Sequence, residues 1–179
     1  MNLSMVRQAP RHVIMGKTMR PVGKTIMKWQ EIAEMPCSVA RSQAILGDRW
    51  TMLILRNAFL AMRRYEDFQT QLGLPRHILS SRLKRLVEAG VLKKVPYQER
   101  PARYEYRLTD MGRDLYPVII ALTAWGDKWL DEGRGAPLLL HHKTCGHDFH
   151  PVTTCSECGE PVLPRDVVAL AGPGLQRVG

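Results

Sequence analysis

The chain has 179 residues, which is room for one domain of ordinary size and a small appendage. Hydrophobic residues make up 45% of it and charged residues 24%, a globular composition that excludes disorder along the whole chain. The 26 basic and 17 acidic residues give a net charge of +9, which favours an anionic partner: nucleic acid, an acidic membrane surface or an acidic protein. The longest strongly apolar stretches, 52–62 and 116–125, are too short for a membrane span of about 20 residues.

The excess positive charge lies in two segments. Residues 1–26 contain five bases and no acid, and residues 76–107 contain nine bases against three acids. A basic stretch this concentrated is typical of a surface that binds phosphates, although a basic solvent-exposed surface without a partner has the same signature.

Residues 1–35 are expected to be a disordered extension, because residues 1–26 scatter Met, Pro and Gly without an amphipathic period. Three explanations of the first 26 residues stay open: a true start at Met27, a basic arm that touches DNA, and an organellar transit peptide.

Four helices are expected in the first part of the folded region. The first covers 38–46, and the second follows Asp48, which caps it. Apolar residues at helical spacing predict a third helix over 65–72 that ends at Gly73. The fourth is predicted over about 75–89, opened by a proline and closed by a glycine.

The fourth helix has one apolar side and one polar, basic side. The apolar side, which is expected to face the core, consists of Leu79, Leu83, Leu86 and Val87. The opposite side consists of His77, Ser81, Lys84 and Glu88, flanked by Ser80 and Arg85.

A β-hairpin and a last helix follow. The strand-like runs 91–95 and 104–108 flank a polar segment, 96–103, which predicts a hairpin with an extended basic tip. Thr109 then caps a long helix over 110–132, with a kink expected near Pro117. The apolar positions of this helix are Leu115, Ile119, Leu122, Trp125 and Trp129, and both tryptophans are expected in the core.

These elements predict a mainly α fold with a small β-hairpin wing, the order of a winged helix-turn-helix. A helix has the right width for the major groove of DNA, and a hairpin tip with arginines can contact the neighbouring backbone or the minor groove. Winged helices also serve as protein-interaction modules, and that alternative stays open.

Several segments resemble the HxlR-type, MarR-like regulators of bacterial transcription. The matching motifs are CSVAR at 37–41, LGDRWTMLILR at 46–56, RYEDF at 64–68, LSSRLKRLVEAGVL at 79–92 and PARYEYRLTDMG at 101–112. The resemblance covers about 36–132 and implies a cytoplasmic, homodimeric, sequence-specific DNA-binding regulator, expected to be a repressor. It also implies that the helices 38–46 and 110–132 form the dimer interface and that the operator has two-fold symmetry.

On this basis the helix 75–89 is expected in the major groove and the wing 96–103 on the adjacent backbone or minor groove. The residues expected to contact base edges are His77, Ser80, Ser81 and Lys84. Those expected on phosphates or in the minor groove are Arg76, Arg85, Arg100 and Arg103. Arg82 lies nearer the core side of the helix and is expected to brace the fold through an ion pair.

Cys37 stands where some members of this family carry a redox- or electrophile-sensing cysteine. The N-terminus of the helix 38–46 favours a thiolate there, and Arg41 lies one turn on. The alternative is a small buried residue whose sulfur is inert.

Residues 133–179 are expected to form a linker and a zinc-ribbon-like appendage. Two turns share the pattern x-x-Cys-Gly, and together they offer a closed tetrahedral ligand set for structural zinc: His142, Cys145, Cys155 and Cys158. His147 and His150 compete for the place of the nitrogen ligand. A metal-free ribbon and a Cys155–Cys158 redox pair stay open as alternatives.

The sequence contains no phosphate-binding glycine motif, nucleophile elbow or zinc-helix motif, so catalysis is not expected. The rival function is a protein-interaction adaptor, or one that responds to zinc or oxidants, whose winged helix does not bind DNA. No sequence feature identifies the operator or an effector.

Overall fold

The computed structural model describes residues 29–175 and divides the chain into two compact units. One unit comprises residues 42–152, and the other contains the described residues before 42 and after 152. The sequence indicated no regular structure over 1–35. Residues 1–28 of that range lie outside the described residues, whereas Trp29–Ala33 form the short helix α1.

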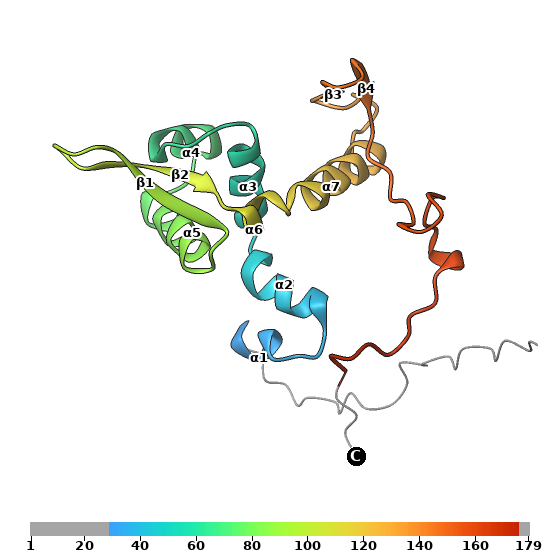
Figure 1. The fold of residues 1–179 in the computed structure, drawn as a ribbon. Helices are drawn as coiled ribbons and strands as arrows, with labels where there is room; N and C mark the ends of the chain where they lie inside the picture. Colours follow the sequence, from blue (N-terminus) through green and yellow to red (C-terminus); the bar gives the residue numbers. More distant parts are fainter. Residues whose placement is uncertain (1–28, 176–179) are drawn as a thin grey trace, which may run out of the picture. The chain divides into compact units, whose positions relative to one another are not determined.

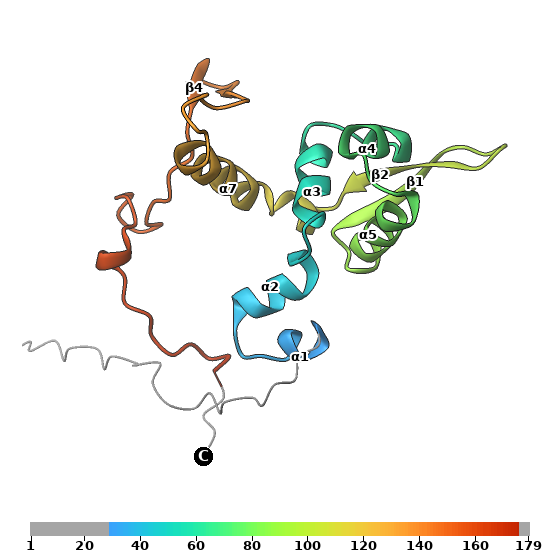
Figure 2. The ribbon, with the colours of Figure 1, turned by 180° about the vertical axis from the view of Figure 1, so that it is seen from behind.

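The expected order of helices and hairpin is confirmed (Figures 1 and 2). The helices from α2 to α5 are Ser38–Leu46, Thr51–Phe59, Tyr65–Leu72 and Arg76–Glu88. The wing consists of β1, Leu92–Gln98, and β2, Arg103–Leu108. The elements that follow are α6 (Asp110–Arg113), α7 (Tyr116–Trp129), β3 (Leu140–His142), β4 (His147–Phe149) and the 3-10 helix η1 (Pro164–Asp166). None of the helices in residues 29–175 combines the length and apolar character that crossing a membrane requires.

Local polar contacts set several helix ends. The carboxylate of Asp48 accepts hydrogen bonds from the backbone N–H groups of Trp50 (2.9 Å) and Thr51 (3.2 Å), so it caps α3 as expected. Gly73 ends α4 in the left-handed conformation, with φ of 61°. Thr109 Oγ1 accepts a hydrogen bond from Gly112 N–H at 3.1 Å, which confirms the predicted cap before α6.

The wing is an antiparallel hairpin whose register runs from the pair Leu92–Leu108 to the pair Pro96–Tyr104. The first strand is longer than the predicted run 91–95, because β1 continues past Pro96 to Gln98 with an irregularity in the register. The segment just before α4 pairs briefly with the outer side of β2, since Tyr106 N–H donates a hydrogen bond to the carbonyl oxygen of Arg63 at 2.7 Å.

The core of this unit lies between α3, α4, α5, the wing and α7. Its buried residues are Ile54, Leu55, Phe68, Leu74, Leu79, Leu83, Leu86, Val91, Leu92 and Ile119. The predicted apolar side of α5 therefore faces the core, with Leu79 and Leu83 fully buried and Val87 half-buried. Burying leucines of this size contributes about 2 kcal/mol each, so the core fixes which side of α5 faces outward.

The prediction of one long, kinked helix over 110–132 is wrong. Two helices, α6 and α7, occupy this segment, and Pro117 lies in the first turn of α7. Proline lacks an N–H group, and the first turn of a helix is where that group has no intrahelical partner, so a new helix begins there instead of a kink.

The prediction that Trp125 and Trp129 belong to the core is also wrong. Their side chains are 55% and 64% exposed, and Leu122 is 51% exposed. Only Ile119 of the apolar positions expected on this helix is buried, while Leu115 is half-buried. The outer side of α7 is therefore an apolar surface in the single chain.

Gly112 is a position where a methyl group cannot be accommodated. It is buried in α6, and a Cβ there would collide with the backbone carbonyl oxygen of Val91. That oxygen already accepts hydrogen bonds from Thr109, so it cannot move freely.

Gly112→Ala is expected to lower the free energy of unfolding by about 2 kcal/mol, because the collision involves backbone atoms. Chemical denaturation measures the change. Gly126→Ala in α7 is the matched control: nothing lies within 4 Å of its added Cβ, so alanine there should leave stability unchanged or raise it by up to about 1 kcal/mol. Equal effects of the two substitutions would contradict the packing described for Gly112.

Candidate nucleic-acid interface

The helix-turn-helix consists of α4, a turn through Gly73 and α5. A tyrosine joins the two helices: Tyr65 Oη donates a hydrogen bond to the carbonyl oxygen of Arg76 at 3.0 Å. Ser80 Oγ donates in turn to Tyr65 Oη at 3.3 Å. These bonds fix the start of α5 relative to α4, and they engage one of the residues that the sequence placed on the binding side.

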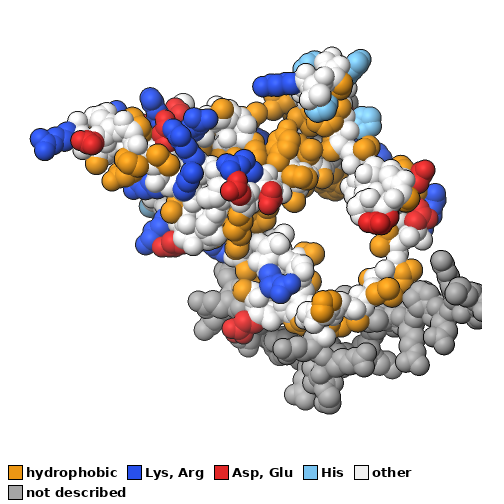
Figure 3. All heavy atoms as spheres, in the orientation of Figure 1, with side chains coloured by type: hydrophobic (Ala, Val, Ile, Leu, Met, Phe, Trp, Pro, Cys, Tyr) orange, Lys and Arg blue, Asp and Glu red, His pale blue; other side chains and the backbone are white. Residues whose placement is uncertain are grey.

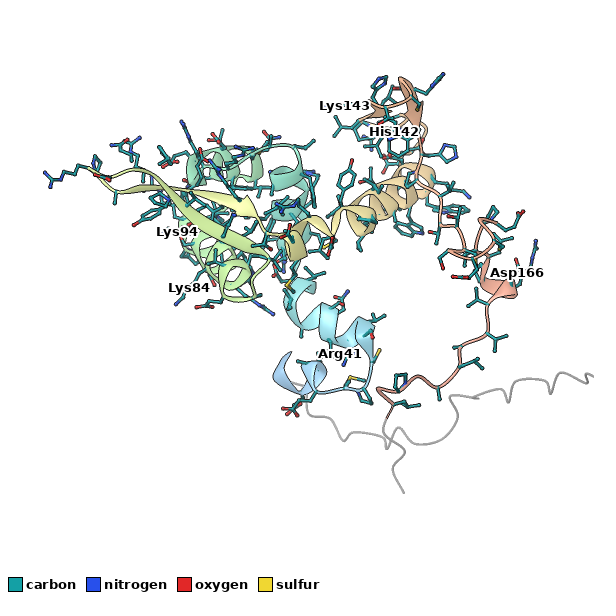
Figure 4. The ribbon with its side chains drawn as sticks, in the orientation of Figure 1. Arg41, Lys84, Lys94, His142, Lys143 and Asp166 are labelled. Carbon is teal, nitrogen blue, oxygen red and sulfur yellow. The ribbon has the colours of Figure 1, made fainter. Side chains whose placement is uncertain are left out.

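The outward side of α5 carries four exposed residues that were expected to contact base edges: His77, Ser80, Ser81 and Lys84. Arg76, at the start of the helix, is exposed as well. Nζ of Lys84 lies 3.7 Å from Oε1 of Glu88, and the two side chains are 76% and 63% exposed (Figure 4). An ion pair this exposed contributes little energy, so Lys84 can exchange its carboxylate for another anion.

Two other arginines of α5 are directed into the protein. Arg82 Nε lies 3.0 Å from Asp48 Oδ1, with the side chains 26% and 12% exposed, which confirms the predicted bracing ion pair. Arg85 is half-buried and donates a hydrogen bond to the carbonyl oxygen of Ala44 in α2. Sequence reasoning assigned Arg85 to phosphate, whereas in this structure its guanidinium joins α5 to α2.

Asp48 connects the start of α3 to α5. Partial burial tends to raise its pKa, but hydrogen bonds from Thr51 and Trp50 and the charge of Arg82 outweigh burial and lower the pKa below 3.8. The ionised carboxylate is therefore the form that the fold stabilises.

The wing presents bases along its length. Arg100 and Arg103 are exposed near the tip, as the sequence predicted. Nζ of Lys94 lies 4.0 Å from the ring centroid of Tyr104 on the facing strand (Figure 4). Figure 3 shows Lys and Arg side chains gathered over the hairpin and its tip.

Sequence reasoning missed two of the bases around the wing, Lys94 and Arg64. The guanidinium of Arg64 lies 4.8 Å from the ring centroid of Tyr97, so it supports the wing from the segment beside β2. The lysines of β1 and the tyrosines at alternate positions of β2, Tyr104 and Tyr106, could have indicated the Lys94–Tyr104 contact. No sequence signal indicates the contact of Arg64 with Tyr97, because it depends on the pairing of the segment before α4 with β2.

Cys37 is half-buried just before α2, and its carbonyl oxygen accepts the N–H of Arg41 at 3.0 Å. The guanidinium of Arg41 donates to Ser38 Oγ at 3.1 Å (Figure 4). Redox sensing by Cys37 stays a prediction.

The structure brings the predicted metal ligands together in two pairs. His142 Nδ1 lies 3.3 Å from Cys145 Sγ at the β3–β4 hairpin. Cys155 and Cys158 lie in a second turn, where hydrogen bonds from the backbone N–H groups of Cys158 and Glu157 and from the Cys158 thiol lower the pKa of the Cys155 thiol. The pairs belong to different units, and no group of three or more His, Cys, Asp or Glu side chains within residues 29–175 is arranged to hold a metal ion.

Comparison with known proteins identifies the family. The model of the HxlR-like helix-turn-helix family matches residues 45–134. The chain belongs to this family. It is 47% identical over 139 residues to the HTH-type transcriptional regulator Rv3095 of Mycobacterium tuberculosis, a match that covers 78% of this chain and 88% of the relative.

Two solved structures of proteins described as candidate transcription factors are similar to this chain. The crystal structure of PA1607, described as a candidate transcription factor, has a TM-score of 0.71 and 35% identity, covering 78% of this chain and 98% of that one. PA1374 of Pseudomonas aeruginosa, described in the same terms, has a TM-score of 0.56 and 33% identity, with 79% and 96% covered. These similarities confirm the predicted winged helix-turn-helix fold.

Asp48→Asn is expected to lower the free energy of unfolding by about 2 kcal/mol, because it removes the charge that pairs with the largely buried Arg82. Chemical denaturation at neutral pH measures this change. Glu88→Gln on the same helix is the matched control, since its pair with Lys84 is exposed and its loss should cost less than about 0.5 kcal/mol.

The pH dependence of the same difference provides an independent check. Because the pKa of Asp48 is lowered in the folded protein, its contribution is fully present above the ordinary value of 3.8. The contribution is lost as the pH falls through the lower folded-state pKa. A difference between wild type and Asp48→Asn that grows as the pH falls below 3.8 would contradict the assignment.

Proposed function

We propose that this protein regulates transcription by binding DNA, with α5 in the major groove and the wing on the adjacent backbone or minor groove. The observation that carries the proposal is the division of α5 into a buried leucine side and an exposed side of His77, Ser80, Ser81 and Lys84. Membership of the HxlR-like helix-turn-helix family supports it, and the Mycobacterium tuberculosis relative is named a transcriptional regulator.

The exposed side chains of α5 have the chemistry that base edges require. Lysine and histidine nitrogens donate to the acceptors of guanine, and serine hydroxyls can donate or accept. The bases of the wing are suited to phosphates, which supply most of the affinity and none of the direct sequence information. Lys94, Arg100 and Arg103 are all exposed on this hairpin and therefore accessible to a phosphate backbone.

DNA binding is tested by titrating the full chain with the duplex upstream of its own gene, with unrelated duplex as competitor, at several salt concentrations. Competitor-resistant binding is the expected result. The double variant Lys84→Ala with Arg103→Ala should bind more weakly, because it loses a base-edge contact and a phosphate contact. The magnitude of the slope of log K against log salt concentration should fall by about 1, for the one phosphate-neutralising charge that Arg103 supplies.

The matched control is Arg134→Ala with Arg165→Ala. It removes two exposed arginines that lie outside the helix-turn-helix and the wing. Like Lys84, each of these arginines lies near a carboxylate. Its salt slope should equal that of the wild type. A protein-interaction module would give the opposite pattern, with weak binding that competitor abolishes and a slope that the first variant leaves unchanged.

We further propose that the protein is a homodimer whose interface includes the outer side of α7. Four exposed apolar residues recur there at intervals of four, three and four, which puts them on one side of the helix: Val118, Leu122, Trp125 and Trp129. Ile119, about a quarter turn away around the helix, is buried in the core, so apolar residues cover more of α7 than the core itself takes up. Helices of this kind are buried on both sides in an assembly, and a second copy supplies an identical apolar surface. Figure 3 shows this orange surface over α7.

The dimer is tested by sedimentation velocity of Leu122→Glu combined with Trp125→Glu. Two carboxylates at the centre of the apolar stripe should raise the dissociation constant of the dimer at least about 30-fold, since one central interface residue commonly contributes about 2 kcal/mol. Val167→Glu, at an exposed apolar residue outside α7, should leave the sedimentation coefficient unchanged. A dimer that persists in the double variant would mean that the interface lies elsewhere.

A further inference from the structure

A pocket lies at the base of the wing, where α3, β2, α6 and the start of α7 meet (Figure 1). Its volume is about 690 Å³, within the range of about 300–1,000 Å³ that is usual for small-molecule sites. The residues that line it all belong to the described unit 42–152, and they do not include residues of α5. The pocket is therefore complete within one unit and separate from the helix that is expected in the major groove.

One wall of the pocket is apolar and aromatic. The ring centroids of Phe59, at the end of α3, and Tyr116, at the start of α7, lie 5.0 Å apart with an interplanar angle of 52°. Ala58 and Met62 also line the pocket and are half-buried. Tilted rings of this kind offer a face and an edge to a flat apolar group, so this wall suits a ligand with an aromatic body.

The loop that leaves α3 is fixed by its own backbone. The N–H groups of Ala61 and Met62 donate to the carbonyl oxygens of Ala58 and Asn57, both at 3.1 Å, which is the Schellman arrangement of a helix end. The left-handed residue of this arrangement is usually glycine, but here it is Ala61, with φ of 66°. Ala61 lines the pocket, so a methyl group is kept at this wall despite the backbone strain that it causes.

The rest of the lining is strongly basic. Four of the described residues that line the pocket are bases and none of them is acidic. The bases are Arg63, Lys93, Arg107 and Arg113. Lys93 of β1 lies directly opposite Arg107 of β2, and the segment that carries Arg63 pairs with the other side of β2. Like charges on adjacent strands destabilise a sheet, and an anion between them removes that penalty.

Two of these bases already have carboxylate partners. Arg107 Nη2 lies 2.8 Å from Glu105 Oε2. Arg113 pairs with Asp110 and also donates to the carbonyl oxygen of Leu108 at 3.0 Å, so its guanidinium is held at the edge of the pocket.

The other two bases are not neutralised in this way. Arg63 and Lys93 are exposed, and neither forms an ion pair with a carboxylate among residues 29–175. Adjacent strands are about 4.8 Å apart, so these long side chains approach the pocket from the two sides of β2. The pocket therefore combines an aromatic wall with two positive charges that are available to a ligand.

We propose that this pocket binds a small organic phosphate with an aromatic body, the chemistry shared by aryl phosphates and nucleoside monophosphates. A phosphate monoester carries a charge of about −1.5 to −2 at pH 7, which matches the two unpaired bases, whereas a single carboxylate would leave one of them without a partner. Arginine donates to two phosphate oxygens at once, and lysine adds a point charge. The aromatic body packs on Phe59 and Tyr116. Binding here does not require DNA, because the outward side of α5 takes no part in it.

The test is isothermal titration calorimetry of the full chain, without DNA, with phenyl phosphate and with adenosine monophosphate. Saturable binding to a single site per chain is expected. The tighter of the two ligands identifies the kind of body that the aromatic wall accepts. Phenol and inorganic phosphate, which each have only one part of the ligand, should bind at least about tenfold more weakly.

Variants of the lining separate the contributions of charge and aromatic wall. Lys93→Ala and Arg63→Ala should each raise the dissociation constant of the tighter ligand about tenfold, because each removes a charge-assisted hydrogen bond. Tyr116→Ala should raise it about fivefold through the loss of ring contact. Lys94→Ala and Arg64→Ala are the matched controls. They remove the neighbouring bases, whose side chains lie against aromatic rings outside the pocket, and should leave the dissociation constant unchanged.

Far-ultraviolet circular dichroism of each variant establishes whether it is folded. Absence of binding by both organic phosphates would overturn the site. Equal affinity for inorganic phosphate and phenyl phosphate would overturn the role of the aromatic wall, and equal affinity for benzoate would overturn the choice of phosphate. If neither organic phosphate binds and Lys93→Ala and Arg63→Ala each lower the magnitude of the salt slope of DNA binding by about 1, the two bases belong to the DNA interface instead.

Discussion

The burial of one side of α5 is the constraint on which the winged-helix unit depends. Leu79, Leu83 and Leu86 are removed from water almost completely, and together they contribute several kcal/mol to a fold that is only marginally stable. Because a helix cannot rotate without exposing these leucines, the residues on its opposite side have a fixed direction. The same hydrophobic contacts that stabilise the fold thus determine which side chains α5 presents outward.

Basic residues of α5 have two different roles, and their burial distinguishes them. Lys84 lies in solvent beside a carboxylate that is also exposed, so its charge is available to a partner. Arg82 and Arg85 are directed inward, one to Asp48 and the other to the carbonyl oxygen of Ala44. Both inward contacts fix α5 to segments more than thirty residues earlier in the chain. The positive charge of this helix is therefore divided between holding its position and presenting an interaction surface.

The sequence was sufficient where structure is determined locally. The end of α4 at Gly73 and the cap of α3 by Asp48 depend on one residue and its immediate neighbours, and both were predicted correctly. The inner side of α5 was also predictable, because the period of its leucines coincides with the turn of a helix. The ion pair of Arg82 followed from the same wheel, although the identity of its partner did not.

The failures have a common physical origin, which is contact between distant segments. Nothing near Arg85 indicates that a carbonyl group of α2 will accept its hydrogen bond, and nothing near Arg64 indicates the ring of Tyr97. Pro117 was expected to kink a helix and instead lies in the first turn of a new one, because the segment before it closes around Thr109 and the carbonyl oxygen of Val91. The apolar pattern alone cannot distinguish a tryptophan buried in the core from one exposed on an apolar surface, since both recur along the sequence with the spacing of a helix.

The exposed apolar side of α7 is a feature of the single chain that its own packing does not explain. The winged-helix core accommodates Ile119 of α7 and leaves Trp125 and Trp129 mostly in water, a costly arrangement for side chains of this size. An apolar surface of this kind is stabilised when a second apolar surface covers it, which is the reason for proposing that a second copy of the chain packs on α7.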